Sequence, residues 1–244
     1  MNEPHQKDPK LGKIKARFAE LQASIWHLLS EFIYWNDVMR YPDTPTDSER
    51  LGRAAAFERN IINENQVRYL AIAKEDSIIL NLWALLYDDG QDSEPNLHRL
   101  AKDLNDPRHF PDRKPSRSLT DCCRYLNRDG FRNRFDLHRN QFIAHLSSVR
   151  PCADNVVDYS HIYRVVPKVI CLVESLHKEL ESHPSYFDNQ FSTTASRVAR
   201  FFSHSEPDRL LGELFANRSL PTSEFEEAIE KFLELYVQRE KGAR

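Results

Sequence analysis

Three polar residues whose side chains could contact a phosphate group lie close together in the chain: Arg139, Asn140 and His145. Histidine, with an ordinary pKa of about 6.5, can accept a proton near neutral pH. The planar guanidinium of arginine can bind two phosphate oxygens and stabilise the charge that develops on them. We therefore take Arg139, Asn140 and His145 as candidate functional residues that could act on a phosphate group.

The spacing of Arg139 and His145 predicts how a helix would present them. At about 100° per residue, the two side chains lie about 120° apart and about one and a half turns along the axis. They do not lie on one face of the helix. They can therefore flank one phosphate only if the long arginine side chain extends around the helix, or if two copies of the helix face each other. Because two-fold dimers are the commonest oligomers, we expect a homodimer.

Arginine is concentrated around this motif. Residues 99–150 contain 10 Arg and 2 Lys against 6 Asp, a local net charge of +6, whereas the whole chain carries −3. Because arginine suits phosphate contacts, Arg128, Arg132 and Arg134 are predicted to bind RNA in an electropositive groove near Arg139. A solvated arginine face, neutralised by the acidic remainder of the chain, explains the same composition.

Helices are the elements that must position the motif. Only 6 of the 244 residues are glycine, 40% are hydrophobic, and apolar residues recur at steps of three and four. We therefore predict an all-α bundle over residues 1–183, with a helical C-terminal extension, residues 184–244, packed on it. The predicted helices cover 11–39, 46–74, 77–87, 96–104, 116–128, 131–147, 160–182, 191–203, 207–217 and 222–240, and the stretch 77–87 is either separate from 46–74 or continuous with it.

Capping patterns and glycine mark some of the helix boundaries. Ser223 with Glu226 forms a predicted capping box at the start of the last helix. Ser116 or Ser118 could cap the helix that follows a proline-broken stretch. Gly130 is expected to separate that helix from the one that carries the motif, or to kink one into the other.

The helix that carries the motif has an apolar stripe. Phe131, Phe135, His138 and Phe142 recur at helical spacing and should face the core. His138 is therefore predicted to be a hydrogen-bonded core residue. His145 falls at the continuation of the stripe, at the edge of a buried seam.

Several other classes of protein are excluded by the sequence. The first ten residues lack an apolar signal segment, and no apolar run is long enough to cross a membrane. Cys122, Cys123, Cys152 and Cys171 form no CxxC pair, and the histidines lack metal-ligand spacing. No glycine-rich phosphate loop occurs. We expect a cytoplasmic protein, not attached to a membrane, with no metal and no cofactor.

The segment RNQFIAH at 139–145 resembles the R-(polar)-x(3–5)-H signature of HEPN domains. Residues 66–104, 139–147 and 159–176 also resemble, in order, the HEPN proteins associated with abortive-infection systems of bacteria, a likeness that spans roughly residues 20–180. This resemblance implies an α-helical bundle, often dimeric, that acts as a metal-independent ribonuclease through Arg139, Asn140 and His145. HEPN toxins paired with a nucleotidyltransferase antitoxin carry tyrosine two residues after the histidine, where this chain has Ser147.

The leading hypothesis is thus a HEPN-type RNA endonuclease that serves as a toxin or abortive-infection component in phage defence. Its expected partners are an RNA substrate, a second copy of the chain, and a cognate antitoxin or defence-system protein. The alternatives are a non-catalytic HEPN bundle that binds a protein or a nucleic acid, and a plain helical scaffold. The discriminating feature is whether Arg139 and His145 are adjacent and reachable by solvent.

Overall fold

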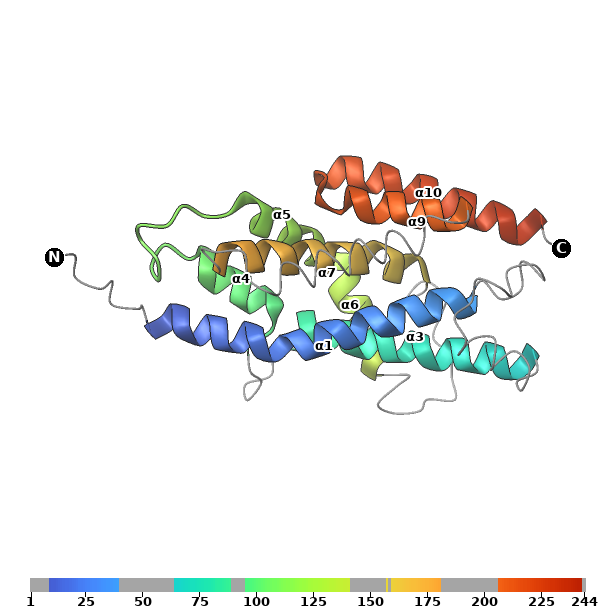
Figure 1. The fold of residues 1–244 in the computed structure, drawn as a ribbon, viewed down its shortest axis with the longest axis horizontal. Helices are drawn as coiled ribbons and strands as arrows, with labels where there is room; N and C mark the ends of the chain where they lie inside the picture. Colours follow the sequence, from blue (N-terminus) through green and yellow to red (C-terminus); the bar gives the residue numbers. More distant parts are fainter. Residues whose placement is uncertain are drawn as a thin grey trace.

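The computed structural model describes residues 9–39, 64–88, 95–140, 157, 159–180 and 206–242. Within those residues the regular elements are helices and no strand occurs, so the all-α prediction is confirmed (Figure 1). The helices are α1 (Pro9–Met39), α3 (Glu64–Leu86), α4 (Leu97–Asn105), α5 (Arg117–Leu126), α6 (Asp129–His138), α7 (Tyr159–Leu180), α9 (Glu206–Ala216), the 3₁₀ turn η5 (Asn217–Ser219) and α10 (Thr222–Gly242).

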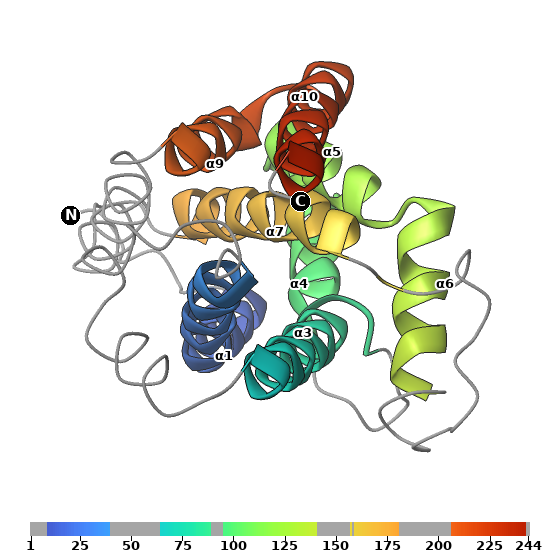
Figure 2. The same ribbon diagram turned by 90° about the vertical axis from the view of Figure 1, so that its right-hand side faces the viewer.

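Helix α7 lies between two layers of helices. Helices α1 and α3 pack along one side of it, and the hairpin of α9 and α10 lies on the opposite side (Figures 1 and 2). Most residues of α7 are buried, including Pro167, which lies inside the helix. A helix that is apolar nearly all round is expected at the centre of a bundle. One hydrophobic core therefore joins the N-terminal helices to α9 and α10.

Helix α1 confirms the helix predicted over residues 11–39. Its buried residues include a row at steps of three and four, namely Ile14, Phe18, Leu21, Ile25, Leu28, Phe32 and Trp35. Phe32 and Trp35 contact the ring of Tyr163 on α7. Helix α3 runs without a break, so of the two arrangements open for the predicted helices over 46–74 and 77–87, separate or continuous, the structure shows the continuous one. Lys74 of α3 forms a 2.9 Å ion pair with Glu31 of α1, which fixes the two helices side by side.

The segment from α4 to α6 shows where local signals succeed and fail. The side chain of Asn96 caps α4 by accepting a 3.0 Å hydrogen bond from the Arg99 amide. Ser116 precedes α5, but its side chain makes no capping hydrogen bond. The chain turns at Asn127 and at Arg128, whose ψ is 138°. The break therefore precedes Gly130, which lies inside α6.

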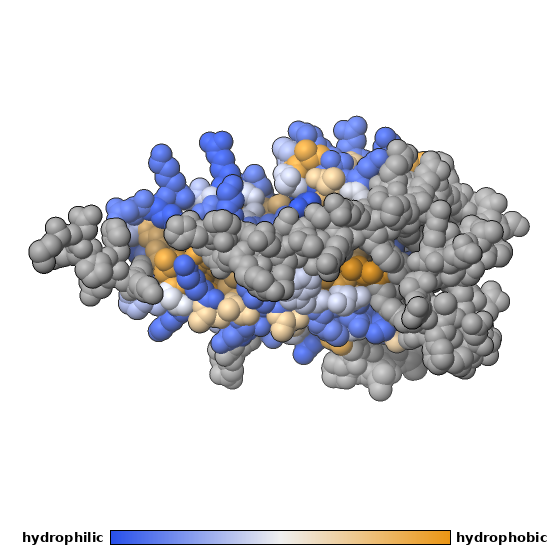
Figure 3. All heavy atoms as spheres, viewed as in Figure 1, coloured by the Kyte–Doolittle hydropathy of each residue, from blue (hydrophilic) through white to orange (hydrophobic). Residues whose placement is uncertain are grey.

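On the face seen in Figure 3, the described side chains that are visible are mostly hydrophilic, with apolar atoms in limited patches. Leu80 is the one large hydrophobic residue that is exposed among the residues with described side chains. None of the described helices is both long enough and apolar enough to span a membrane.

Candidate functional site

Arg139 and Asn140 lie just beyond the end of α6. The helix ends at His138, and the backbone continues through a wider, π-type turn at Arg139 and Asn140. Such turns occur frequently at functional sites. The Nη1 atom of Arg139 donates a 2.8 Å hydrogen bond to Oδ1 of Asn140. Arg139 is half-buried and Asn140 is exposed, so solvent reaches both residues.

The guanidinium of Arg139 stacks on an aromatic ring of another helix. Its Cζ atom lies 4.3 Å from the centre of the Trp83 ring, within the range of a cation–π interaction. The indole nitrogen of Trp83 donates a 2.5 Å hydrogen bond to Oδ1 of Asp136, one turn before Arg139 on α6. Trp83 and Asp136 were not among the residues singled out from the sequence, because Trp83 reaches this group only through the packing of α3 against α6.

His138 is buried, as predicted, and so are Phe131 and Phe135. The Nε2 atom of His138 lies 3.3 Å from Oδ1 of Asp76 on α3. Asp76 and Trp83 are seven residues apart, so they share one face of α3 at a separation of about two turns. That face of α3 therefore contacts the consecutive residues His138 and Arg139 and fixes the end of α6.

His145 and Ser147 fall at residues 141–150, outside the described part of the chain. Phe142 and Cys152 also lie outside it. The proximity of His145 to Arg139 accordingly stays a prediction. The candidate site consists of Arg139, Asn140 and the side chains that hold them.

The three predicted RNA-binding arginines lie in different surroundings. Arg132 is exposed, lies on the same face of α6 as Arg139, and has its Nε atom 3.8 Å from Oδ2 of Asp136. Arg134 is half-buried. Arg128 precedes the first turn of α6, about 16 Å from Arg139 along the helix axis. The structure places Arg132 on the same face as Arg139, about 10 Å away along the helix axis, and places Arg128 at the opposite end of the helix.

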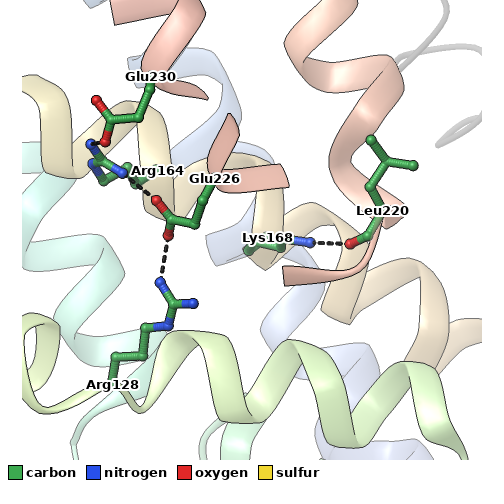
Figure 4. A network of polar contacts seen from close by, with 6 residues as sticks. All are labelled: Arg128, Arg164, Lys168, Leu220, Glu226 and Glu230. Carbon is green, nitrogen blue, oxygen red and sulfur yellow. Dashed lines mark hydrogen bonds and ion pairs between the residues drawn. The ribbon is translucent and has the colours of Figure 1, made fainter. Parts of the chain in front are cut away.

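A second polar cluster, the α10 seam, joins Arg128, Arg164 and Lys168 to α10 and η5 (Figure 4). The two carboxylate oxygens of Glu226 accept hydrogen bonds of 2.5 Å, one from Arg128 and one from Arg164. Arg164 also pairs with Glu230. The guanidinium charges at this seam are therefore neutralised within the fold.

The predicted capping box at the start of α10 is wrong. Helix α10 begins at Thr222, so Ser223 lies inside its first turn. Glu226 is bound by Arg128 and Arg164 instead of returning to the backbone of the first turn. Hydrogen bonds to charged partners are stronger than neutral ones, which explains why the arginines hold this carboxylate.

Lys168 anchors the turn between α9 and α10. Its Nζ atom donates hydrogen bonds of 2.8 and 2.9 Å to the carbonyl oxygens of Arg218 and Leu220. The same atom lies 4.2 Å from the centre of the Phe225 ring. Lys168 is 3% exposed, and this burial lowers the pKa of its ammonium group.

The thiols of Cys122 and Cys171 meet between α5 and α7, with their sulfur atoms 3.1 Å apart. Both cysteines are buried. The hydrogen bond from Cys122 lowers the pKa of the Cys171 thiol. Within the described ranges, no three His, Cys, Asp or Glu side chains gather into a group that could hold a metal ion.

No family model matches the chain, and neither curated proteins nor solved structures yield a match. The all-α architecture is established by the structure alone. The HEPN assignment rests on the sequence resemblance, and the function must be argued from the residues around Arg139.

Proposed function

We propose that this protein is a metal-independent RNA endonuclease of the HEPN type, in which Arg139 and His145 act together. The observation that supports the proposal most is the setting of Arg139. Its half-buried guanidinium is held by the face of Trp83 and by the amide oxygen of Asn140. Both partners are uncharged, so the guanidinium keeps its positive charge for a phosphate group.

The reaction would follow from the chemistry of these side chains. His145 removes the proton from a 2′-hydroxyl, whose oxygen attacks the adjacent phosphorus atom. Arg139 stabilises the negative charge on the phosphorane oxygens. The bond to the 5′-oxygen breaks, and that oxygen takes up a proton. The products are a 2′,3′-cyclic phosphate and a 5′-hydroxyl end, and DNA is not cleaved because it lacks the attacking hydroxyl.

Arg132 and Arg134 supply additional phosphate contacts in this proposal, whereas Arg128 would contact RNA only if RNA displaces its partner Glu226. We propose that the active form is a cytoplasmic homodimer in which two copies of the motif face one groove. Its role would be that of a toxin or an abortive-infection component, controlled by an antitoxin or another defence protein. The presence of Ser147 argues against control through modification of a tyrosine at that position.

The test is cleavage of a labelled RNA in the presence of EDTA, with analysis of the product ends. Cleavage that persists in EDTA and leaves 2′,3′-cyclic phosphates supports the proposal. DNA of the same sequence is the matched control and should stay intact. Loss of all cleavage in EDTA would contradict a metal-independent mechanism.

A second candidate is a bundle that binds nucleic acid without cleaving it. Arg132, Arg139 and Trp83 favour it, because a cationic and aromatic surface suits RNA binding whatever the position of His145. Retention of RNA on the protein without any cleaved product would support this function.

A further inference from the structure

We propose that Trp83 is the positioning residue of the ribonuclease site, an inference that rests on the proposed function. Trp83 holds the Arg139 guanidinium against its ring and, through its indole nitrogen, keeps Asp136 from neutralising that guanidinium. The residue is 56 positions before Arg139 and belongs to α3.

Stacking and ion pairing have different consequences for an arginine. A carboxylate partner uses the N–H groups of the guanidinium and cancels its charge. An aromatic face attracts the guanidinium through the ring quadrupole and leaves the N–H groups, which point outward in the plane of the group, available for a phosphate. Among the described residues, Asn140 supplies the one hydrogen-bond acceptor that meets the Arg139 guanidinium.

Asp136 is the acceptor that would otherwise compete for Arg139. The two residues are three positions apart on α6, a spacing at which side chains of opposite charge form ion pairs. Instead, Oδ1 of Asp136 accepts the 2.5 Å hydrogen bond from Trp83, and Oδ2 faces Arg132 at 3.8 Å. The indole thus occupies the carboxylate with one edge and holds the guanidinium with its face.

The core holds Trp83 in this position. Its ring packs against the hydrophobic core, and Leu82 and Leu85 on either side of it are buried. Asp76, on the same face of α3, contacts His138, the residue before Arg139. The position of Arg139 is therefore determined by α3, a helix that the catalytic motif itself does not include.

Two variants separate the functions of the ring and of the indole nitrogen. Trp83→Leu removes the aromatic face, and we expect kcat for RNA cleavage to fall about tenfold, with a smaller change in KM. Trp83→Phe keeps an aromatic face but releases Asp136, which then pairs with Arg139, and we expect a fall of about fivefold. Thermal unfolding of each variant shows whether the fold persists.

The decisive variant is the double substitution Trp83→Phe with Asp136→Asn. Asparagine cannot neutralise Arg139, so the double variant should cleave RNA about fivefold faster than Trp83→Phe alone. If Trp83 only stabilised the fold, the double variant should instead be less active than Trp83→Phe, because it carries two changes at one packed contact. Activity of the double variant equal to or below that of Trp83→Phe overturns the proposal.

A spectroscopic measurement tests the contact without RNA cleavage. The chain has 3 tryptophans, so ¹⁵N-labelled protein should give three indole N–H resonances, and Trp83→Phe identifies the one from Trp83. Arg139→Ala should shift that resonance, whereas Arg124→Ala, which removes an exposed arginine of α5, should not. An unchanged Trp83 resonance in Arg139→Ala overturns the positioning proposal. Absence of cleavage by the unmodified protein, with the resonance shifted, overturns the proposed function and leaves the contact established.

Discussion

Arg128 precedes the first turn of α6 and Arg139 follows its last, and the two arginines have different partners. Arg128 binds Glu226 of α10 at 2.5 Å and lies over the ring of Tyr125. Arg139 lies over the ring of Trp83 and contacts Asn140. Both guanidinium groups stack on an aromatic ring, but Arg128 also pairs with a carboxylate, that of Glu226. The comparison teaches that arginine density by itself does not mark a binding surface; the partners of each guanidinium decide whether its charge remains available.

The same contrast extends to the elements around each end of α6. At the α10 seam, Arg164 and Lys168 come from the buried helix α7, and their partners belong to α10 and to the turn before it. These contacts fasten the C-terminal hairpin to the bundle. At the other end, α3 holds Arg139 beside solvent. We therefore expect substitutions at the seam to change stability and substitutions of Arg139 or Trp83 to change the rate of cleavage.

The largest effect is expected at the motif itself. His145→Ala should lower the rate of RNA cleavage by about 10²–10⁴-fold through loss of the general base. Arg139→Ala should lower it by about 10²–10³-fold through loss of charge stabilisation. Arg139→Lys should recover little, because lysine lacks the planar fork. The measurement is single-turnover cleavage of a labelled RNA, with urea unfolding to confirm that each variant is folded.

His138→Ala is the matched control for the histidine. Because His138 is buried against Asp76, its removal should lower the free energy of unfolding by about 1–3 kcal/mol. Cleavage by the folded fraction should change far less than in His145→Ala. If His145→Ala cleaves RNA at the rate of the unmodified protein, the assignment of nuclease activity to this motif is wrong.

Lys168→Met should give the largest loss of stability at the seam. Methionine keeps the apolar stem, but the carbonyl oxygens of Arg218 and Leu220 are left without their charged donor. We expect the free energy of unfolding to fall by about 3 kcal/mol, measured with urea. A decrease below about 1 kcal/mol would show that Lys168 is not the anchor of this turn.

The loss of stability in Lys168→Met should depend on pH, and this dependence is a second test of the role of Lys168. Burial places the pKa of Lys168 in the folded protein below its ordinary value of 10.5. Between the two values the unfolded chain binds a proton that the folded protein has released, so the contribution of Lys168 to stability increases as pH rises through that window. The difference between the unmodified protein and Lys168→Met should therefore widen as the pH rises toward 10.5. A difference that narrows would contradict the direction of the pKa shift.

Glu226→Gln should have a smaller effect. The amide keeps one acceptor oxygen, and Arg164 keeps its pair with Glu230, but both Arg128 and Arg164 are deprived of a charged partner. Arg164 is 17% exposed, so solvent compensates only in part. We expect a decrease of about 1–2 kcal/mol in the free energy of unfolding. Equal stability of the variant and the unmodified protein would show that the ion pairs of Glu226 do not help to hold the seam together.

Patterns within one helix were predictable from the sequence, and contacts between helices were not. The stripe of α1 and the burial of His138 follow from steps of three and four residues, a local property. Trp83 carries no local sign that it contacts Arg139, because that contact depends on the packing of α3 against α6. Ser223 and Glu226 match a capping box, but arginines from other parts of the chain take the carboxylate. Charged partners distant in sequence therefore override a local pattern.

The smallest expected effect compares two arginines of α6 in RNA binding. Arg132→Ala should weaken binding of a non-cleavable RNA, because Arg132 is exposed and lies on the same face as Arg139. Arg128→Ala should weaken it less, because Glu226 already neutralises Arg128, and should instead lower the free energy of unfolding by about 1 kcal/mol or less. Binding measured over a range of salt concentrations checks this, since removal of one arginine–phosphate interaction lowers the salt dependence by a slope of about one. A greater decrease of affinity and of salt dependence in Arg128→Ala than in Arg132→Ala would show that RNA displaces Glu226 from Arg128, and the basic surface would then extend along the whole of α6.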